Sequence, residues 1–359
     1  MRRHRIAVIP GDGVGPEVTG EALRALDVAA RAGGFGVDLT PFDLGAGRYL
    51  ATGQVLPEAA LEDLSAHDAI FLGAVGDPRV QPGILEEGLL LRLRQELDLY
   101  VNLRPSRLFE GVPSPLRDAT PGNLDIVIVR ENTEGLYKRG AEAALTGGGE
   151  AALTGGREAA LTGSGEAALE ISVNTPDAVQ RVVRYAFALA AEAGRSVTLV
   201  HKENVLRRAG QLYRTVFEEV AGEYPGVPTA YQHVDAAALL LVTDPRRFQV
   251  IVTDNLFGDI LSDLAAGLVG GIGFVGSGNI HPGKVSVFEP VHGSAPDIAG
   301  TGRANPIGAI LSATLMLRHL GEAAAAGRIE KAVGAVAGKV AAAGLHTREV
   351  GELVAQAAA

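Results

Sequence analysis

Cysteine is absent from the 359 residues, and its absence limits both the covalent and the metal chemistry of the chain. Disulfides and thiolate metal sites are excluded, so any metal must be held by oxygen or histidine ligands. Long apolar runs are also absent. None reaches bilayer-spanning length, and the first, residues 6–9, stops at Pro10 and Gly11. We therefore expect neither a membrane segment nor a signal peptide, and the expected compartment is the cytoplasm.

The chain has fewer basic than acidic residues. The formal net charge is −10, from 32 lysines and arginines against 42 aspartates and glutamates. This balance argues against nucleic acid and against an anionic membrane surface as partners, although it leaves room for a local basic pocket. With 47% hydrophobic and 21% charged residues, the composition is typical of a soluble globular protein, and the length is sufficient for two domains.

Short apolar runs alternate with helical patterns along the chain. We expect buried strands at residues 6–9, 69–74, 125–129, 196–201 and 248–253. Helical patterns fill the intervals, and an alanine-rich helical region follows Leu320. This alternation predicts an α/β protein with a largely parallel sheet.

A glycine-rich loop follows the first expected strand. Gly11-Asp12-Gly13-Val14-Gly15 leads into a helix that Pro16 opens and that ends near Gly33 and Gly34. Such a loop can direct backbone amides at an anion or a ribose. An ordinary strand-to-helix turn is the simpler interpretation of this motif alone.

Residues 141–169 form a low-complexity insert in which Glu-Ala-Ala-Leu-Thr-Gly units recur with a period of eight. Eight residues are too few for a solenoid repeat. Each unit also carries little apolar surface to bury. We therefore predict a flexible, expanded surface loop, with a partner-binding segment as the alternative.

A second glycine pattern, Gly271-Ile272-Gly273-Phe274-Val275-Gly276, matches the dinucleotide-binding G-x-G-x-x-G pattern. That fingerprint requires a strand before it and a helix after it. Here the pattern follows an expected helix and leads into a loop. A Rossmann domain is therefore not expected.

Two carboxylates follow the expected strand at residues 248–253. Asp259 and Asp263 are four residues apart, so on a helix they share one face, and Asn255 or Gly258 would stand near the N-cap. At ~5 Å and an effective dielectric near 20, their repulsion costs roughly 3 kcal/mol. A divalent cation held by oxygen ligands would offset this cost. An acidic first turn that favours the helix dipole is the alternative.

Among the other candidates for chemistry, Arg130 and Lys202 stand at the ends of expected strands. The remaining candidates are Arg92, Arg94, Arg104, Tyr137 and Asp235. Arginine suits bidentate recognition of carboxylates, although a surface ion pair explains any single one. A lysine at a strand end can serve as a general base. Asp235, beside small apolar residues, fits either a helix N-cap or a metal ligand. Spacing alone leaves these alternatives open.

Several longer motifs, spread over nearly the whole chain and interrupted by the insert, together resemble the motifs of a known protein family. They are Gly11-Asp12-Gly13-Val14-Gly15-Pro16-Glu17, Asn102-Leu103-Arg104-Pro105, Val129-Arg130-Glu131-Asn132-Thr133-Glu134-Gly135, residues 254–263, and Glu289-Pro290-Val291-His292-Gly293-Ser294-Ala295-Pro296-Asp297-Ile298-Ala299-Gly300. With these motifs in this order, the chain resembles the isocitrate and isopropylmalate dehydrogenase family of metal-dependent β-decarboxylating dehydrogenases.

The resemblance implies an α/β fold, not Rossmann, in which two α/β domains flank a cleft around a shared sheet. The first domain would be discontinuous, residues 1–99 with 270–359, and would bind NAD. Residues 100–269 would hold the metal ligands and the dimer interface, with the insert at 141–169.

Site residues are carried over from the same resemblance. Substrate carboxylates would be bound by Arg94, Arg104 and Arg130. One Mg²⁺ or Mn²⁺ ion would be held by Asp235, Asp259 and Asp263, with Asp235 also near the substrate. Tyr137 and Lys202 would transfer protons. In the family Lys202 and Asp235 reach in from the neighbouring subunit, which implies a homodimer with shared active sites.

Cofactor and substrate choice are expected from two further segments. The adenosine-binding loop would comprise His292, Gly293, Ser294, Ala295, Asp297, Ile298 and Asn305. A carboxylate at Asp297 can accept hydrogen bonds from ribose hydroxyls but would repel a 2′-phosphate, which favours NAD. The leucines at positions 89–91, Leu90 and Leu91 in particular, would face the variable group of the substrate and suit an isopropyl substituent.

The expected reaction is therefore the NAD-dependent oxidative decarboxylation of 3-isopropylmalate in leucine biosynthesis. Two alternatives stay open. One is the same chemistry on tartrate, D-malate, homoisocitrate, isocitrate or another alkylmalate, because Glu131-Asn132-Thr133-Glu134-Gly135 is a form shared with such relatives. The other is a catalytically silent regulatory subunit.

Overall fold

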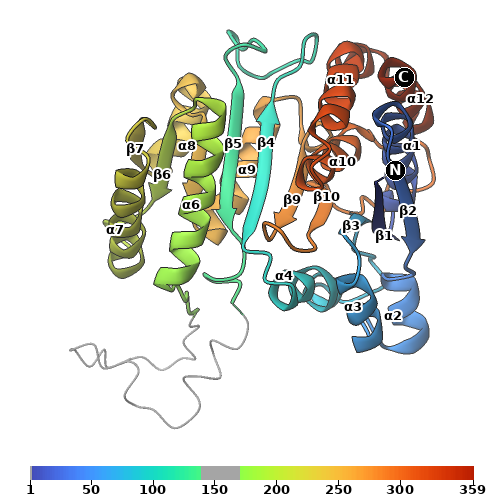
Figure 1. The fold of residues 1–359 in the computed structure, drawn as a ribbon, viewed down its shortest axis with the longest axis horizontal. Helices are drawn as coiled ribbons and strands as arrows, with labels where there is room; N and C mark the ends of the chain where they lie inside the picture. The colour runs from blue at the N-terminus through green and yellow to red at the C-terminus, as the bar shows by residue number, and fades with distance from the viewer. Residues whose placement is uncertain (1, 139–169) are drawn as a thin grey trace.

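The fold was obtained as a computed structural model that describes residues 2–138 and 170–359. The low-complexity insert at 141–169 lies outside these residues. The strands of the described chain form one ten-stranded sheet in the order β2-β1-β3-β10-β9-β4-β5-β8-β6-β7 (Figure 1). Their bounds are β1 Arg3–Gly11, β2 Gly36–Pro41, β3 Ala69–Ala74, β4 Val101–Arg107, β5 Asp125–Glu131, β6 Val197–His201, β7 Thr229–His233, β8 Val250–Thr253, β9 Gly276–Ile280 and β10 Val287–Pro290.

The sheet is parallel on both flanks and antiparallel in the middle. Strand β4 pairs antiparallel with β5 and with β9, and β9 pairs antiparallel with β10. The remaining pairs are parallel. The predicted α/β class with a largely parallel sheet is confirmed, and the strand order is not that of a Rossmann fold. The second glycine pattern follows a helix, as the sequence predicts, but it spans a 3₁₀ turn, Ile272–Phe274, and the start of β9, so a strand stands where a loop was expected.

Helices cover both faces of the sheet. Figure 1 shows α6 in front of β5 and α9 behind it, with α10 and α11 in front of the other half of the sheet. None of the described helices is both long and apolar enough to span a membrane. The helical bounds are α1 Gly15–Gly33, α2 Ala46–Thr52, α3 Glu58–Ser65, a π-helical turn Glu86–Leu91, α4 Arg92–Glu96, α6 Pro176–Ala193, α7 Arg207–Glu223, α8 Val234–Thr243, a 3₁₀ turn Pro245–Arg247, α9 Asn255–Leu268, α10 Ile307–His319, α11 Ala323–Ala343 and α12 Thr347–Ala358.

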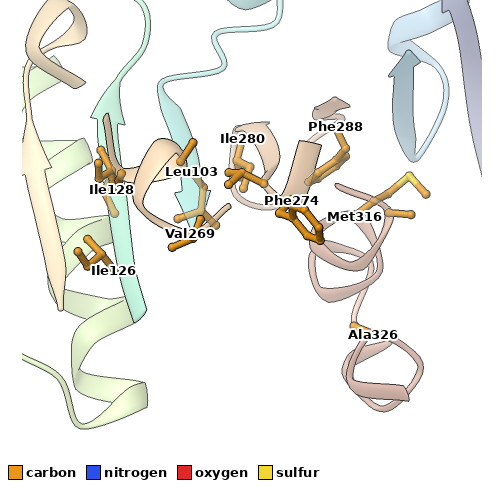
Figure 2. Packing of buried hydrophobic residues seen from close by; sticks show 14 of the residues in the cluster. Leu103, Ile126, Ile128, Val269, Phe274, Ile280, Phe288, Met316 and Ala326 are labelled. Carbon is orange, nitrogen blue, oxygen red and sulfur yellow. The ribbon is translucent and has the colours of Figure 1, made fainter. Parts of the chain in front are cut away.

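The main hydrophobic core runs across the whole sheet. Figure 2 shows Ile126 and Ile128 of β5 continuing through Leu103 to Phe274 and Ile280, without a break where the two expected domains meet. Burying one such side chain stabilises the fold by roughly 1.5–3 kcal/mol. The shared core and the shared sheet therefore join the two halves along β4 and β9.

The glycine-rich loop after β1 agrees with the simpler of its two interpretations, an ordinary strand-to-helix turn. The backbone amide of Asp12 donates to Ala74 O at 2.8 Å, that of Val14 to Ser294 O at 2.8 Å, and that of Gly15 to Asp12 O at 2.9 Å. These amides are therefore unavailable to an anion. Gly13 has a φ of 57°, and a Cβ there would lie 1.9 Å from Ser294 O, so glycine permits close packing against the loop after β10.

Candidate active site

Helix α9 presents the two predicted carboxylates beside an arginine. The helix follows β8, and Asp254 caps it by accepting a hydrogen bond from the Phe257 amide at 2.8 Å. The N-cap expected at Asn255 or Gly258 is therefore one to four residues too late. Arg104 of β4 points at the acidic face: its Nη1 lies 3.4 Å from Asp259 Oδ1 and 3.3 Å from Asp263 Oδ1. The arginine offsets the repulsion between the carboxylates.

Arg130 is the most deeply buried charge of the site, with 1% of its side chain exposed. It stands near the end of β5, donates from Nε to Asn255 Oδ1 at 2.9 Å, and forms an ion pair with Asp259. Burial, together with Arg94 and Arg104, lowers its pKa. A Cβ at Gly258 would lie 2.5 Å from Arg130 Cγ, so the glycine makes room for the arginine on α9.

Arg94 reaches the same site from α4. It is buried, and its nearest carboxylate is Glu289 of β10, with Nη2 and Oε1 3.6 Å apart. Burial lowers its pKa. Glu289 is fixed in turn by the Asn279 side chain, which donates to Oε1 at 2.8 Å. The Nε atoms of Arg94 and Arg104 are buried without a hydrogen-bond partner among the described residues, which suits an anionic ligand.

Tyr137 completes the cluster. Its hydroxyl donates to Asp259 Oδ2 at 2.9 Å, and the guanidinium carbon of Arg130 lies 5.1 Å from the centre of its ring. Burial and the charge of Asp259 raise the pKa of the phenol, so it is protonated at neutral pH. It can therefore donate a proton at this point.

The two carboxylates of α9 differ in their surroundings. Burial raises the pKa of both, but for Asp259 the charges of Arg130 and Arg104 outweigh burial and the net shift is downward. For Asp263 burial prevails over Arg104, and the pKa is raised. Asp263 is also the more open of the two, with 63% of its side chain exposed against 38% for Asp259. Asp259 is therefore the firmly ionised, anchored member.

Lys202 and Asp235 form a separate pair. They follow β6 and β7, and the Lys202 ammonium donates to Asp235 Oδ1 at 2.6 Å, which lowers the pKa of the carboxyl. In the described part of the chain, neither forms an ion pair with Asp259 or Asp263. No three histidine, aspartate or glutamate side chains of residues 2–138 and 170–359 gather as a metal-binding group. One chain thus brings together two of the three predicted metal ligands.

The predicted adenosine-binding residues lie in one loop after β10, except Asn305, which precedes α10. This loop packs on the glycine-rich loop through the Val14–Ser294 bond. Glu17 of α1 accepts hydrogen bonds from the amides of Gly300 and, at 3.1 Å, Gly302. Burial lowers the pKa of His292, whose Nε2 is buried and unbonded in the described structure. Asp297 is exposed, free to meet a ligand.

The leucine segment behaves only partly as expected. Leu89 is fully buried in a second core cluster, so it cannot face a substrate. Leu90 is half-buried against the same cluster, and Leu91 is half-buried as well. The segment is a π-helical turn that leads directly into α4 and Arg94. Such turns occur frequently at functional sites.

Several side chains of the site were not identified as site residues in the sequence analysis. Ser262 accepts a hydrogen bond from Arg104 Nη1 at 2.7 Å, Asn255 holds Arg130, and Glu289 holds Arg94. All three residues lie in motifs that the sequence analysis singled out. Only the arrangement of the strands and of α9 in space shows which arginine each residue contacts. Gly258 carries a weak signal, since a glycine inside a helix usually has a packing reason.

Known proteins resemble this chain along almost its entire length. The family model described as isocitrate/isopropylmalate dehydrogenase matches residues 5–358. A 3-isopropylmalate dehydrogenase of Nocardia farcinica is 54% identical over 331 residues, 92% of each chain. One of Thermobifida fusca is 53% identical over 335 residues, 92% of this chain and 90% of its own.

Solved structures agree with this assignment. An isocitrate dehydrogenase from Methylococcus capsulatus superposes with a TM-score of 0.83 at 37% identity, covering 99% of both chains. A β-decarboxylating dehydrogenase from Thermococcus kodakarensis gives a TM-score of 0.75 at 36% identity, covering 99% of this chain and 96% of that one. The chain belongs to the isocitrate/isopropylmalate dehydrogenase family.

Proposed function

We propose that the chain is an NAD-dependent, divalent-metal-dependent enzyme that oxidatively decarboxylates 3-isopropylmalate to 2-oxoisocaproate in leucine biosynthesis, in the cytoplasm. The observation that carries this proposal is the convergence of three buried arginines and Tyr137 on the acidic face of α9. Eight relatives that are 52–54% identical bear the name 3-isopropylmalate dehydrogenase.

The residues of α9 fit a divalent cation. Carboxylate oxygens are the hard ligands that Mg²⁺ and Mn²⁺ prefer. Asp259 and Asp263 would supply two of them from one chain, and Asp235 a third from a second chain. When bound, the metal would act as a Lewis acid toward the substrate oxygens, and NAD would take the hydride.

Substrate binding and proton transfer would be carried out by side chains of the protein. Arg94, Arg104 and Arg130 would bind and orient the two carboxylates of the substrate, because their guanidinium groups are desolvated and the Nε atoms of Arg94 and Arg104 lack partners in the described chain. Lys202 would accept the hydroxyl proton as general base. Tyr137, protonated at neutral pH, would deliver a proton to carbon once carbon dioxide has left.

The binding of NAD would use His292, Gly293, Ser294, Ala295, Asp297 and Ile298 of the loop after β10, together with Asn305 before α10. The exposed carboxylate of Asp297 would accept hydrogen bonds from the adenosine ribose and repel a 2′-phosphate. The proposed domains are residues 1–99 with 270–359 for NAD, and 100–269 for the metal and the dimer contact. The cleft between them would close on the substrate.

A homodimer would complete the site. Helices α8 and α9 pack side by side and expose Leu239, Val242 and Ile260, with 63%, 46% and 58% of each residue accessible. Apolar side chains this exposed on adjacent helices favour a second copy as partner. The Lys202–Asp235 pair would then serve the site of the partner.

Mixing two inactive variants tests the shared site. If Lys202→Ala and Asp259→Asn chains are co-refolded, half of the dimers are mixed, and each mixed dimer contains one intact site, so about one quarter of the parental activity returns. Each variant refolded alone is the control. Failure of the mixture to exceed either variant would contradict a shared site.

Within the family, the alternative substrate is another 2-hydroxy acid, and the 37% identical isocitrate dehydrogenase structure motivates isocitrate in particular. NADH production is measured with Mn²⁺ and a panel of isopropylmalate, isocitrate, homoisocitrate, tartrate and D-malate, for the parent chain and for Leu90→Ser. We expect isopropylmalate to be preferred and the preference to fall ~10–100-fold in the variant. A better substrate than isopropylmalate would contradict the assignment, and no turnover at all would favour a silent regulatory subunit.

A further inference from the structure

A cavity of about 740 Å³ lies on the face of the sheet opposite α9. Its floor includes Leu103 and Pro105 of β4 and Val127 of β5. Successive side chains of a strand point to opposite faces, so Arg104, between the two β4 residues, faces α9 instead. The cavity and the candidate active site therefore lie on opposite faces of the same strand. Its volume is within the range of small-molecule sites, roughly 300–1,000 Å³.

The side walls are largely apolar and come from both halves of the fold. Helix α6 contributes Leu189, helix α10 contributes Leu311 and Leu315, and the 3₁₀ turn before β9 contributes Phe274. Figure 1 shows α6 and α10 standing on the same side of the sheet, on either side of β4 and β5. A molecule bound here would contact both proposed domains at once.

The charged groups around the cavity are balanced. Arg318 donates two hydrogen bonds to Glu330, at 3.0 and 2.8 Å, and Arg195 donates two to Asp125, at 3.2 and 2.6 Å. The other charged lining residues, Arg107 and Glu192, are exposed and opposite in sign. A charged ligand would have to break one of these pairs or be desolvated without a partner. The walls therefore favour a neutral ligand.

One polar group of the lining has no partner. The Tyr185 hydroxyl makes no hydrogen bond within residues 2–138 and 170–359, and the side chain lies half-buried in the cavity wall, packed against the main core. Burial raises the pKa of the phenol, so it remains a neutral donor at any physiological pH. A hydrogen bond from this hydroxyl to an acceptor on a ligand would stabilise the bound molecule by about 0.5–1.5 kcal/mol.

We propose that this cavity is a binding site for a neutral small molecule with an apolar body and one hydrogen-bond acceptor directed at the Tyr185 hydroxyl. The apolar walls would hold the body, and the phenol would fix its orientation. The site is distinct from the proposed substrate and NAD sites, because its lining includes none of their residues and the sheet separates it from Arg104 and Arg130. Its occupant would bridge α6 and α10.

Prodan, a neutral fluorophore with an apolar naphthalene body and a ketone acceptor, tests the proposal on the full chain. We expect saturable binding of one Prodan per chain with a blue-shifted emission, unaffected by saturating isopropylmalate with Mg²⁺ in the absence of NAD. Leu189→Trp and Leu315→Trp, which fill the cavity from opposite walls, are each expected to weaken binding at least tenfold. Leu50→Trp, on the exposed surface of α2, is the matched control and should leave it unchanged.

Tyr185→Phe tests the hydrogen bond without filling the cavity. Loss of one neutral hydrogen bond is expected to weaken Prodan about fivefold, whereas 2-dimethylaminonaphthalene, which lacks the ketone, should bind the parent and the variant equally. Prodan binding that either tryptophan leaves intact, that isopropylmalate displaces, or that fails to saturate below ~100 µM would overturn the proposal. Equal responses of the two probes to Tyr185→Phe would overturn the role of the hydroxyl.

Discussion

The carboxylates of α9 are expected to have the same catalytic role but different structural roles. Asp259→Asn and Asp263→Asn should both abolish metal-dependent turnover, since each removes one proposed ligand. Only Asp259→Asn should strongly destabilise the fold, because Asp259 neutralises Arg130, which has 1% of its side chain exposed. The pair of variants therefore separates ligation from charge compensation.

The magnitudes follow from burial. Removing one partner of a buried ion pair costs about 3–5 kcal/mol. Asp259 is 38% exposed and Asn255 still accepts from Arg130, so screening reduces the expected loss to about 2 kcal/mol. Asp263 is 63% exposed and lies 3.3 Å from Arg104, so its loss should cost ~0–1 kcal/mol.

Urea unfolding followed by far-UV circular dichroism at pH 7, with EDTA present, measures both losses. The pKa of Asp259 in the folded chain lies below its ordinary value of 3.8, so its ion pair stabilises the fold above that pH. The stabilisation is lost as the pH falls through the lowered folded value, and the difference between the parent and Asp259→Asn should shrink there. Equal unfolding midpoints for the two variants at pH 7 would refute the assignment of Asp259 as the counter-ion of Arg130.

Two further substitutions test the packing and the protonation around α9. Gly258→Ala places a Cβ 2.5 Å from Arg130 Cγ, so we expect it to destabilise the fold by about 1–3 kcal/mol in urea unfolding. Because the arginine is displaced, steady-state kinetics should show a larger rise in KM for isopropylmalate than fall in kcat. Burial raises the pKa of Asp254 to about 7, so the folded chain keeps a proton that the unfolded chain releases near 3.8, and stability falls as the pH rises between these values. Asp254→Asn retains a capping oxygen but cannot ionise. Its free energy of unfolding, measured with urea, should therefore rise relative to that of the parent between pH 4.5 and pH 8, by at most about 4 kcal/mol. A difference in unfolding free energy that does not change with pH would contradict a buried proton on Asp254.

Sequence patterns predicted the parts of the site that depend on local geometry. The strand-to-helix change after β8 and the four-residue spacing predicted that Asp259 and Asp263 share a helical face, and both do meet Arg104. The position of Arg130 near a strand end followed from the apolar run before it. These inferences needed only the periods of helix and strand.

The remaining contacts depend on which strands pair, and no local pattern carries that information. Arg94 meets Glu289 because the sheet places β10 between β3 and β9, next to the end of the chain segment that carries α4. Leu89 was expected at the substrate and is instead in a core, because the π-helical turn changes which side chains face inward. The glycine-rich loop was open to an anion-binding interpretation, but its amides bond to Ala74 and Ser294, two segments distant in sequence.

The charges of the site explain why its ligands should bind together. The charged groups around α9 balance: Arg94, Arg104 and Arg130 against Asp259, Asp263 and Glu289. A divalent cation alone would add positive charge beside three desolvated arginines, and a dianionic hydroxy acid alone would add negative charge beside the carboxylates. The two together add no net charge, and the Lys202–Asp235 ion pair that a second chain would bring to the site would add none either. Metal and substrate binding must therefore be thermodynamically linked, each raising the affinity for the other by the same factor.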